Sequence, residues 1–176
     1  MFRNHKNLIL LLLCALIVRI GLVSWATGFR EHPDMLRWKD WGRISYLYGY
    51  ADTYTPRHLS FGTYPNNMPP GTLYVVSGMY RSWLMAGKIL SQFGIPPGSS
   101  AWVNVILLQI FLKLPSLSAD LGIGLLVYYL IRSLGKSDRA ALNGSALFLF
   151  NPAVLWNSAF WGQMDSINKR FLLFLK

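Results

Sequence analysis

Residues 8–26 read LILLLLCALIVRIGLVSWA, an apolar run interrupted by a single charge, Arg19. A helix needs about 20 such residues to cross the hydrocarbon core of a bilayer. We therefore expect a transmembrane helix over this stretch. Because Arg3, His5 and Lys6 precede it, the positive-inside rule places the N-terminus in the cytoplasm.

A cleaved signal peptide is the alternative for the same stretch, with its apolar part at residues 8–18. A signal peptide ends in a cleavage site of the small-x-small type, and none follows here. Arg19 instead interrupts the sequence where such a site should begin. The pattern favours a retained helix.

The composition of the whole chain also indicates a membrane protein. Apolar residues make up 53% of the sequence and charged residues only 14%, against about a quarter in soluble domains. The net charge of +10 comes from basic residues scattered between apolar segments. This scatter argues against nucleic-acid binding and favours anionic membrane lipids or a phosphorylated lipid substrate. One cysteine permits no internal disulfide and does not reveal the redox compartment.

Two later apolar stretches, residues 115–132 and 140–160, predict a second and a third transmembrane helix. Basic residues cluster around the short connection between them: Arg132, Lys136 and Arg139. Such a cluster is typical of a cytoplasmic loop, here 133–139. Residues 27–114 then form a large external loop, and residues 161–176 form a second external loop and a tail.

Residues 71–90 are apolar enough to raise the question of another span. A full crossing there would leave the basic cluster of the 133–139 loop on the external face, against the positive-inside rule. We therefore expect juxtamembrane helices that lie on the membrane without crossing it. The predicted fold is an all-α polytopic membrane protein, residues 1–176 as one module, with about three transmembrane helices and a large external loop.

Asp34 is the first candidate for chemistry, because an ionised carboxylate at a membrane boundary is costly and usually functional. Pro33 suits the first turn of a helix, and Asp34 beside it would face the positive end of the helix dipole. Helical spacing places Arg37, Trp38 and Trp41 on the face of Asp34. A helix-start residue without a chemical role, beside ordinary interfacial tryptophans, is the alternative.

Three other acidic residues have less distinctive settings. Asp40 points away from the Asp34 face, and we expect it to be a solvated partner of Arg37 or Arg43. Asp165 lies on the stretch WGQMDS, residues 161–166, either as a site residue or as a cap. Lys113 and Asp120 share a helical face, which suits a structural ion pair or snorkelling as well as a substrate role. The histidines show no metal-ligand spacing, so we predict no metal site.

Five blocks in order resemble the N-terminal part of the GT-C glycosyltransferases, polytopic enzymes that use polyprenyl- or dolichyl-phosphate sugars. The blocks are Asp34-x-x-x-Trp38-x-x-Trp41, Met68-Pro69-Pro70-Gly71-Thr72-Leu73-Tyr74, Lys113-Leu114-Pro115 with Ala119-Asp120-Leu121, Asn151-Pro152-Ala153, and Trp161-Gly162-Gln163-x-Asp165-Ser166. The last block looks more like bacterial members than like the glucosyltransferases of the asparagine-linked glycan pathway. Together the blocks span residues 34–166.

The resemblance implies a multi-pass enzyme of the cell membrane with an external active site. Asp34 matches the catalytic base, which would activate an acceptor hydroxyl while a hexose leaves its polyprenyl phosphate with inversion. The acceptor would be a lipid or a glycan, and no cofactor is implied. Candidate substrate-binding residues are Arg30, His32, Arg37 and Lys113 for the phosphate, with Gln163 and Asp165 on the second external loop.

Two other function classes stay open. A complete GT-C enzyme has more transmembrane helices, so the chain resembles the N-terminal portion alone; a non-catalytic subunit or truncated relic that packs with a partner is the main alternative. Gly122 and Gly124 in the second span would suit such packing. A carrier or channel would require polar residues at the centres of the spans, where only Arg19 stands out.

Overall fold

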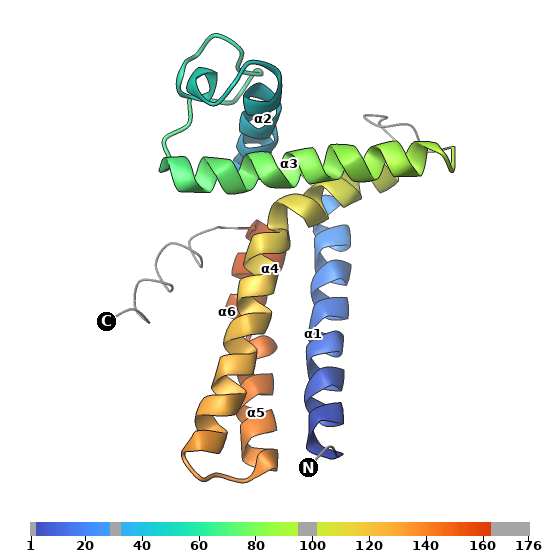
Figure 1. Cartoon of the computed structure of the whole chain (residues 1–176), viewed down its shortest axis with the longest axis vertical. Helices are drawn as coiled ribbons and strands as arrows, with labels where there is room; N and C mark the ends of the chain where they lie inside the picture. Colours follow the sequence, from blue (N-terminus) through green and yellow to red (C-terminus); the bar gives the residue numbers. More distant parts are fainter. Residues whose placement is uncertain (1–2, 29–32, 95–101, 163–176) are drawn as a thin grey trace. The chain divides into compact units, whose positions relative to one another are not determined.

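The computed structural model describes residues 3–28, 33–94 and 102–162, and within these ranges the chain is all-helical, without strands (Figure 1). The elements in order are α1 (Arg3–Thr27), α2 (Pro33–Leu47), η1 (Ala51–Tyr54), α3 (Pro70–Ser91), α4 (Trp102–Ser133), α5 (Asp138–Leu149), α6 (Pro152–Leu155) and η2 (Trp156–Trp161). η1 is a 3₁₀-helix and η2 a single π-helical turn.

The chain divides into two compact units. Unit 1 contains residues 1–23 and 116–176, and unit 2 contains residues 24–115. One boundary falls inside α4, directly after Pro115. Proline lacks the N–H that a helix needs at each interior position, so the hydrogen-bond ladder of α4 is interrupted there.

Two helices are long and apolar enough to cross a membrane, judged by length and composition over the described residues. They are Lys6–Thr27 within α1 and Val103–Ser133 within α4. α3 is not one of them. The second span was expected to begin at residue 115, whereas α4 already begins at Trp102 and continues through Pro115.

The predicted third span, residues 140–160, is not one helix. α5 ends at Leu149, and α6 begins after Asn151, whose side chain accepts a hydrogen bond from the backbone N–H of Ala153 at 2.9 Å. Asn151 is extended, as a residue before proline usually is, and Pro152 takes the first position of the new helix. A third continuous span is therefore not confirmed.

Unit 1 packs α1, the later part of α4 and α5 side by side (Figure 1). The helices approach closely where a glycine removes a side chain: a Cβ on Gly124 would lie 2.6 Å from the Leu149 side chain. Beside this contact, the Ser145 hydroxyl donates to the Gly124 carbonyl at 2.8 Å. Leu8, Tyr128 and Ala141 form a buried cluster.

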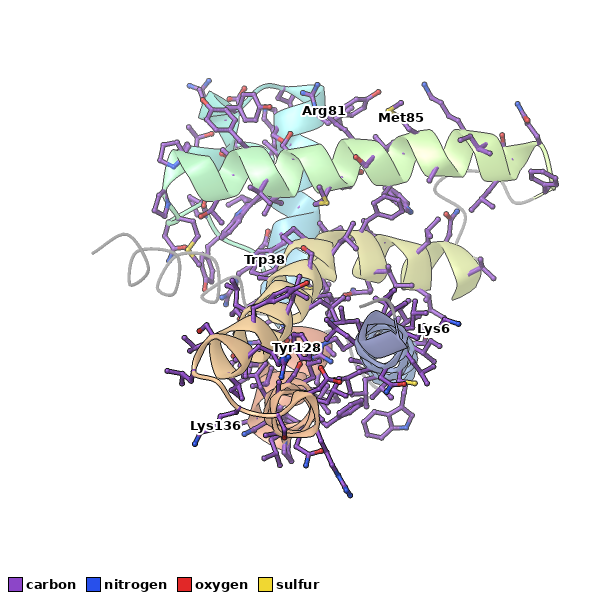
Figure 2. The ribbon with its side chains drawn as sticks, turned by 60° about the horizontal axis from the view of Figure 1, so that its bottom comes forward. Lys6, Trp38, Arg81, Met85, Tyr128 and Lys136 are labelled. Carbon is purple, nitrogen blue, oxygen red and sulfur yellow. The ribbon has the colours of Figure 1, made fainter. Side chains whose placement is uncertain are left out.

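The connection between α4 and α5 is short and capped. The Ser137 side chain accepts a hydrogen bond from the Ala140 N–H at 3.2 Å, and Asp138 lies in the first turn of α5, where its charge suits the helix dipole. The hydroxyl of Tyr128, which lies in α4, donates a hydrogen bond to the carboxylate of Asp138. Lys136 projects outward from this turn (Figure 2).

Unit 2 is organised by α2 and α3, which pack directly on one another. Gly42 of α2 faces Tyr80 of α3, and a Cβ on Gly42 would lie 2.7 Å from the Tyr80 Cβ. Both helices bury apolar side chains in this unit; they are Met35, Trp38, Trp41 and Ile44 on α2 and Leu73, Val76 and Trp83 on α3. The glycine therefore sets how closely α2 can rest on α3.

Candidate functional site

The candidate site begins at the first turn of α2. Pro33 opens the helix and Asp34 follows in the first turn, as the spacing predicted. The Asp34 carboxylate accepts a hydrogen bond from the Arg37 guanidinium, Nη1 to Oδ1, at 2.8 Å. The two side chains are 26% and 23% exposed, so the ion pair is open to a ligand from solvent.

The Arg37 guanidinium also lies on the face of an aromatic ring. Its Cζ is 3.7 Å from the centre of the Tyr64 ring, a distance at which the ring quadrupole attracts a cation. The Nε atom of Arg37 is buried and has no hydrogen-bond partner among the described residues. The guanidinium is thus held by its edge to Asp34 and by its face to Tyr64.

Trp38 and Trp41 were expected to lie on the same helical face as Asp34. The alternative was that they are ordinary tryptophans at the membrane interface. The structure corrects that alternative, because both indoles are buried in unit 2, at 3% and 2% exposure. The Trp41 Nε1–H donates to the Tyr64 carbonyl at 2.9 Å. Both tryptophans therefore anchor α2 in the interior of the unit, and Trp41 also anchors the segment that carries Tyr64.

The expectation that Asp40 is solvated is wrong. Asp40 is 3% exposed and accepts hydrogen bonds from the Ser60 N–H at 2.9 Å, the Ser60 hydroxyl at 2.7 Å and the Thr63 hydroxyl at 2.7 Å. Arg43 was one of its two expected partners and binds it at 2.7 Å. The error arose because helical spacing takes no account of residues 55–69, which cover this side of α2.

The ionisation of Asp40 reflects two opposing effects. Burial is the largest and by itself raises the pKa of a carboxyl group, because it removes the charge from water. Hydrogen bonds from the Ser60 N–H, Arg43, the Ser60 hydroxyl and Thr63 favour the charged form and outweigh burial, so the pKa of Asp40 lies below its ordinary value. Asp40 is therefore a charged structural anchor.

Lys113 and Asp120 do not behave as snorkelling surface residues, because both are buried. They also belong to different units. The Asp120 carboxylate lies 3.3 Å from Arg19 of α1, which is itself fully buried. Arg19 donates further to the Leu149 carbonyl at 2.9 Å and to the Ala15 carbonyl at 3.2 Å. Asp120 thus forms a structural ion pair with Arg19.

Four predicted site residues lie outside the described residues: Arg30, His32, Gln163 and Asp165. Of the predicted set, the structure brings together Asp34 and Arg37. Within the described ranges no group of histidine, cysteine, aspartate or glutamate side chains is arranged to hold a metal ion.

Sequence reasoning missed Tyr64 and the partner of Arg19. Tyr64 carries no local signal, since it lies in a turn-rich segment between Thr63 and Pro65. Arg19 and Asp120 did carry one: they are opposite charges in the two helices that are long and apolar enough to cross a membrane, and buried charges in proteins are usually paired. Comparison with protein-family models, curated proteins and solved structures finds no match to this chain.

Proposed function

We propose that the chain is a membrane glycosyltransferase of the GT-C type, which transfers a hexose from a polyprenyl-phosphate-linked donor to an acceptor hydroxyl at the external face of the membrane. The observation that carries the proposal is the Asp34–Arg37 pair, 2.8 Å apart and partly exposed at the start of α2. A carboxylate and a guanidinium side by side are the two groups that such a transfer requires.

Asp34 is the proposed general base. It takes the proton of the acceptor hydroxyl as the hydroxyl oxygen attacks the anomeric carbon of the hexose. The bond from that carbon to the phosphate oxygen breaks, the electron pair leaves with the lipid phosphate, and the configuration inverts. Arg37 would compensate the charge of the leaving phosphate through charge-assisted hydrogen bonds. The proposed mechanism uses no cofactor or metal.

The proposed membrane arrangement keeps the N-terminus in the cytoplasm of a multi-pass cell-membrane protein. α1 and the part of α4 that begins at Pro115 are two of its spans. Residues 140–160 form the third as a discontinuous element, α5 followed by α6 and η2. Broken helices are tolerated at membrane depth where protein buries the interrupted backbone. Unit 2 is external, and the turn around Lys136 is cytoplasmic.

The exposed face of α3 supports contact with membrane lipids. Arg81 and Met85 extend from the same side of this helix (Figure 2), and Met85, Ile89 and Tyr74 are more than half exposed, at 67%, 60% and 57%. Apolar side chains next to a cation suit the headgroup region of a bilayer that contains anionic lipids. We therefore place α3 at the external interface.

The proposal is tested by transfer assays on membranes that contain the chain, with radiolabelled polyprenyl-phosphate hexoses and a lipid extract as acceptor. We expect Asp34→Asn to lower transfer by about 10²- to 10⁴-fold, the usual contribution of a general base, with membrane insertion unchanged. Asp52→Asn is the matched control, because it removes another carboxylate of unit 2 and should leave transfer intact. Full activity of Asp34→Asn would refute the proposed role.

A further inference from the structure

Segment 55–69 is fastened to α2 at several points. Ser60 and Thr63 donate to the buried carboxylate of Asp40, at distances between 2.7 and 2.9 Å. Arg43 donates to the His58 carbonyl at 2.7 Å, and Trp41 donates to the Tyr64 carbonyl at 2.9 Å. Because these bonds involve buried or half-buried groups, the backbone that carries Tyr64 is held in one position over the helix.

The ring of Tyr64 is thereby placed on the Arg37 guanidinium, 3.7 Å from its centre. An arginine side chain in water samples many rotamers, and fixing one before a ligand arrives removes that entropy cost from binding. Asp34 fixes one edge of the guanidinium at 2.8 Å, and Tyr64 fixes its plane. Because Nε is buried, the Nη groups are the part of Arg37 that an anion could contact.

We propose that Tyr64 is a positioning residue, which orients the Arg37 guanidinium to bind the phosphate of the lipid-linked donor. The inference rests on the proposed function and deepens it, because it names the device that holds the phosphate-binding group. Tyr64 itself contacts Arg37 and takes no part in the chemistry. Asp40 and Trp41 serve the same end indirectly, since they hold the segment on which Tyr64 lies.

The aromatic face, and not the hydroxyl, is the part of Tyr64 that matters in this proposal. Tyr64→Phe keeps a ring, and Tyr64→Trp offers a stronger cation–π surface. Tyr64→Leu keeps an apolar side chain and removes the π face. The chain also offers a matched control in Tyr46, whose ring lies 5.6 Å from the Arg81 guanidinium elsewhere in unit 2.

The experiment measures the affinity of the full chain, in detergent micelles, for farnesyl phosphate, with farnesol as the ligand that lacks the phosphate. We expect Tyr64→Leu to weaken binding of farnesyl phosphate about 3- to 30-fold, the range of a cation–π contact. Tyr64→Phe should stay close to wild type, and Tyr64→Trp should bind as tightly or more tightly. Tyr46→Leu should change nothing, and farnesol binding should be insensitive to every variant.

The outcomes separate the inference from the function on which it rests. A wild-type chain that binds farnesyl phosphate no better than farnesol overturns both. Loss of binding in Arg37→Gln together with unchanged binding in Tyr64→Leu overturns the role of Tyr64 and leaves the phosphate site standing. Should Tyr64→Leu fail to fold, the binding of farnesyl phosphate by Tyr64→Phe and Tyr64→Trp tests the role of Tyr64. Weaker binding by Tyr64→Trp than by Tyr64→Phe would contradict a cation–π role. In transfer assays, the Leu variant should raise KM for the donor more than it lowers kcat.

Discussion

Asp34 and Asp40 are two carboxylates on one helix in opposite surroundings. Asp34 is partly exposed and pairs with Arg37, whereas Asp40 is buried and accepts hydrogen bonds from Ser60, Thr63 and Arg43. A group that reacts must be reachable by its substrate, and a group that holds a segment in place must be shielded from water. In the proposed function, the same side chain would therefore serve chemistry at position 34 and architecture at position 40.

Neutralising Asp40 should destabilise unit 2. We expect Asp40→Asn to lower the free energy of unfolding by about 2–3 kcal/mol, because buried donors then lose a charged acceptor. Urea unfolding followed by tryptophan fluorescence checks this, since Trp38 and Trp41 are buried in the same unit. Asp34→Asn, at the partly exposed pair, should cost less than about 1 kcal/mol.

The same variant tests the ionisation of Asp40. Because its pKa is lower in the folded chain than in the unfolded chain, ionised Asp40 stabilises the fold above the unfolded value of about 4. This stabilisation is lost as pH falls from about 4 through the folded pKa. The difference in free energy of unfolding between wild type and Asp40→Asn should therefore become smaller below about pH 4. If this difference stayed constant down to about pH 2.5, Asp40 would not have the lowered pKa assigned to it.

At the scale of elements, the glycines of α4 differ in what surrounds them. A Cβ at Gly124 would meet the Leu149 side chain at 2.6 Å, whereas a Cβ at Gly122 would meet nothing within 4 Å. We expect Gly124→Ala to destabilise unit 1 by about 1–3 kcal/mol through overpacking. Gly122→Ala should be neutral, or stabilising by up to about 1 kcal/mol from helix propensity. Thermal melts of the two purified variants make the comparison, and equal melting temperatures would count against the packing.

The glycine contacts also bear on a non-catalytic subunit that packs with a partner through α4. Gly124 already packs against Leu149 of its own chain, so it is not available to a partner helix. Of the two glycines suggested for packing with a partner, Gly122 remains available. The sequence suggested small residues for helix packing and did not indicate whether the packing is within the chain or between chains.

Helix positions were predictable where the determining signal is local, and less so where it is not. The length of the apolar runs identified α1 and the later part of α4, and Pro33 marked the start of α2. The break between α5 and α6 was missed, although Asn151-Pro152 carries its signal, because an apolar run of suitable length outweighed it. The length of an apolar run indicates whether the run could cross a bilayer as a helix. It does not indicate whether the backbone hydrogen bonds of that helix are continuous.

For the whole molecule, the proposed topology predicts which surface residues face outward. Cys14 is the one cysteine of the chain, so Cys14→Ser provides a background for single-cysteine variants. In intact cells, a membrane-impermeant maleimide should label Lys39→Cys of α2 and spare Lys136→Cys of the α4–α5 turn. Lys136→Cys should react after permeabilisation. Labelling of Lys136→Cys before permeabilisation would contradict a cytoplasmic turn.

The part of the candidate site that lies on a single helix, α2, was predictable from the sequence, and the rest was not. Asp34 and Arg37 meet because residues three apart on a helix are neighbours. Tyr64 reaches Arg37 through the fold of segment 55–69, which depends on hydrogen bonds with Asp40 and Trp41 that join residues 20 and 23 positions apart. No local pattern reports such a contact, because it exists only once both elements are packed.

The ion pair between Arg19 and Asp120 also constrains how the chain is made. Asp120 follows Arg19 by 101 residues and Leu149 follows it by 130, so during synthesis the cation of α1 precedes both of its later partners. In the proposed topology α1 must enter the bilayer with an uncompensated arginine, at a cost of about 2.5–3.5 kcal/mol on insertion scales. The nascent α1 would then be held at the insertion machinery until α4 and α5 emerge, and the helices of unit 1 would be released into lipid as a group.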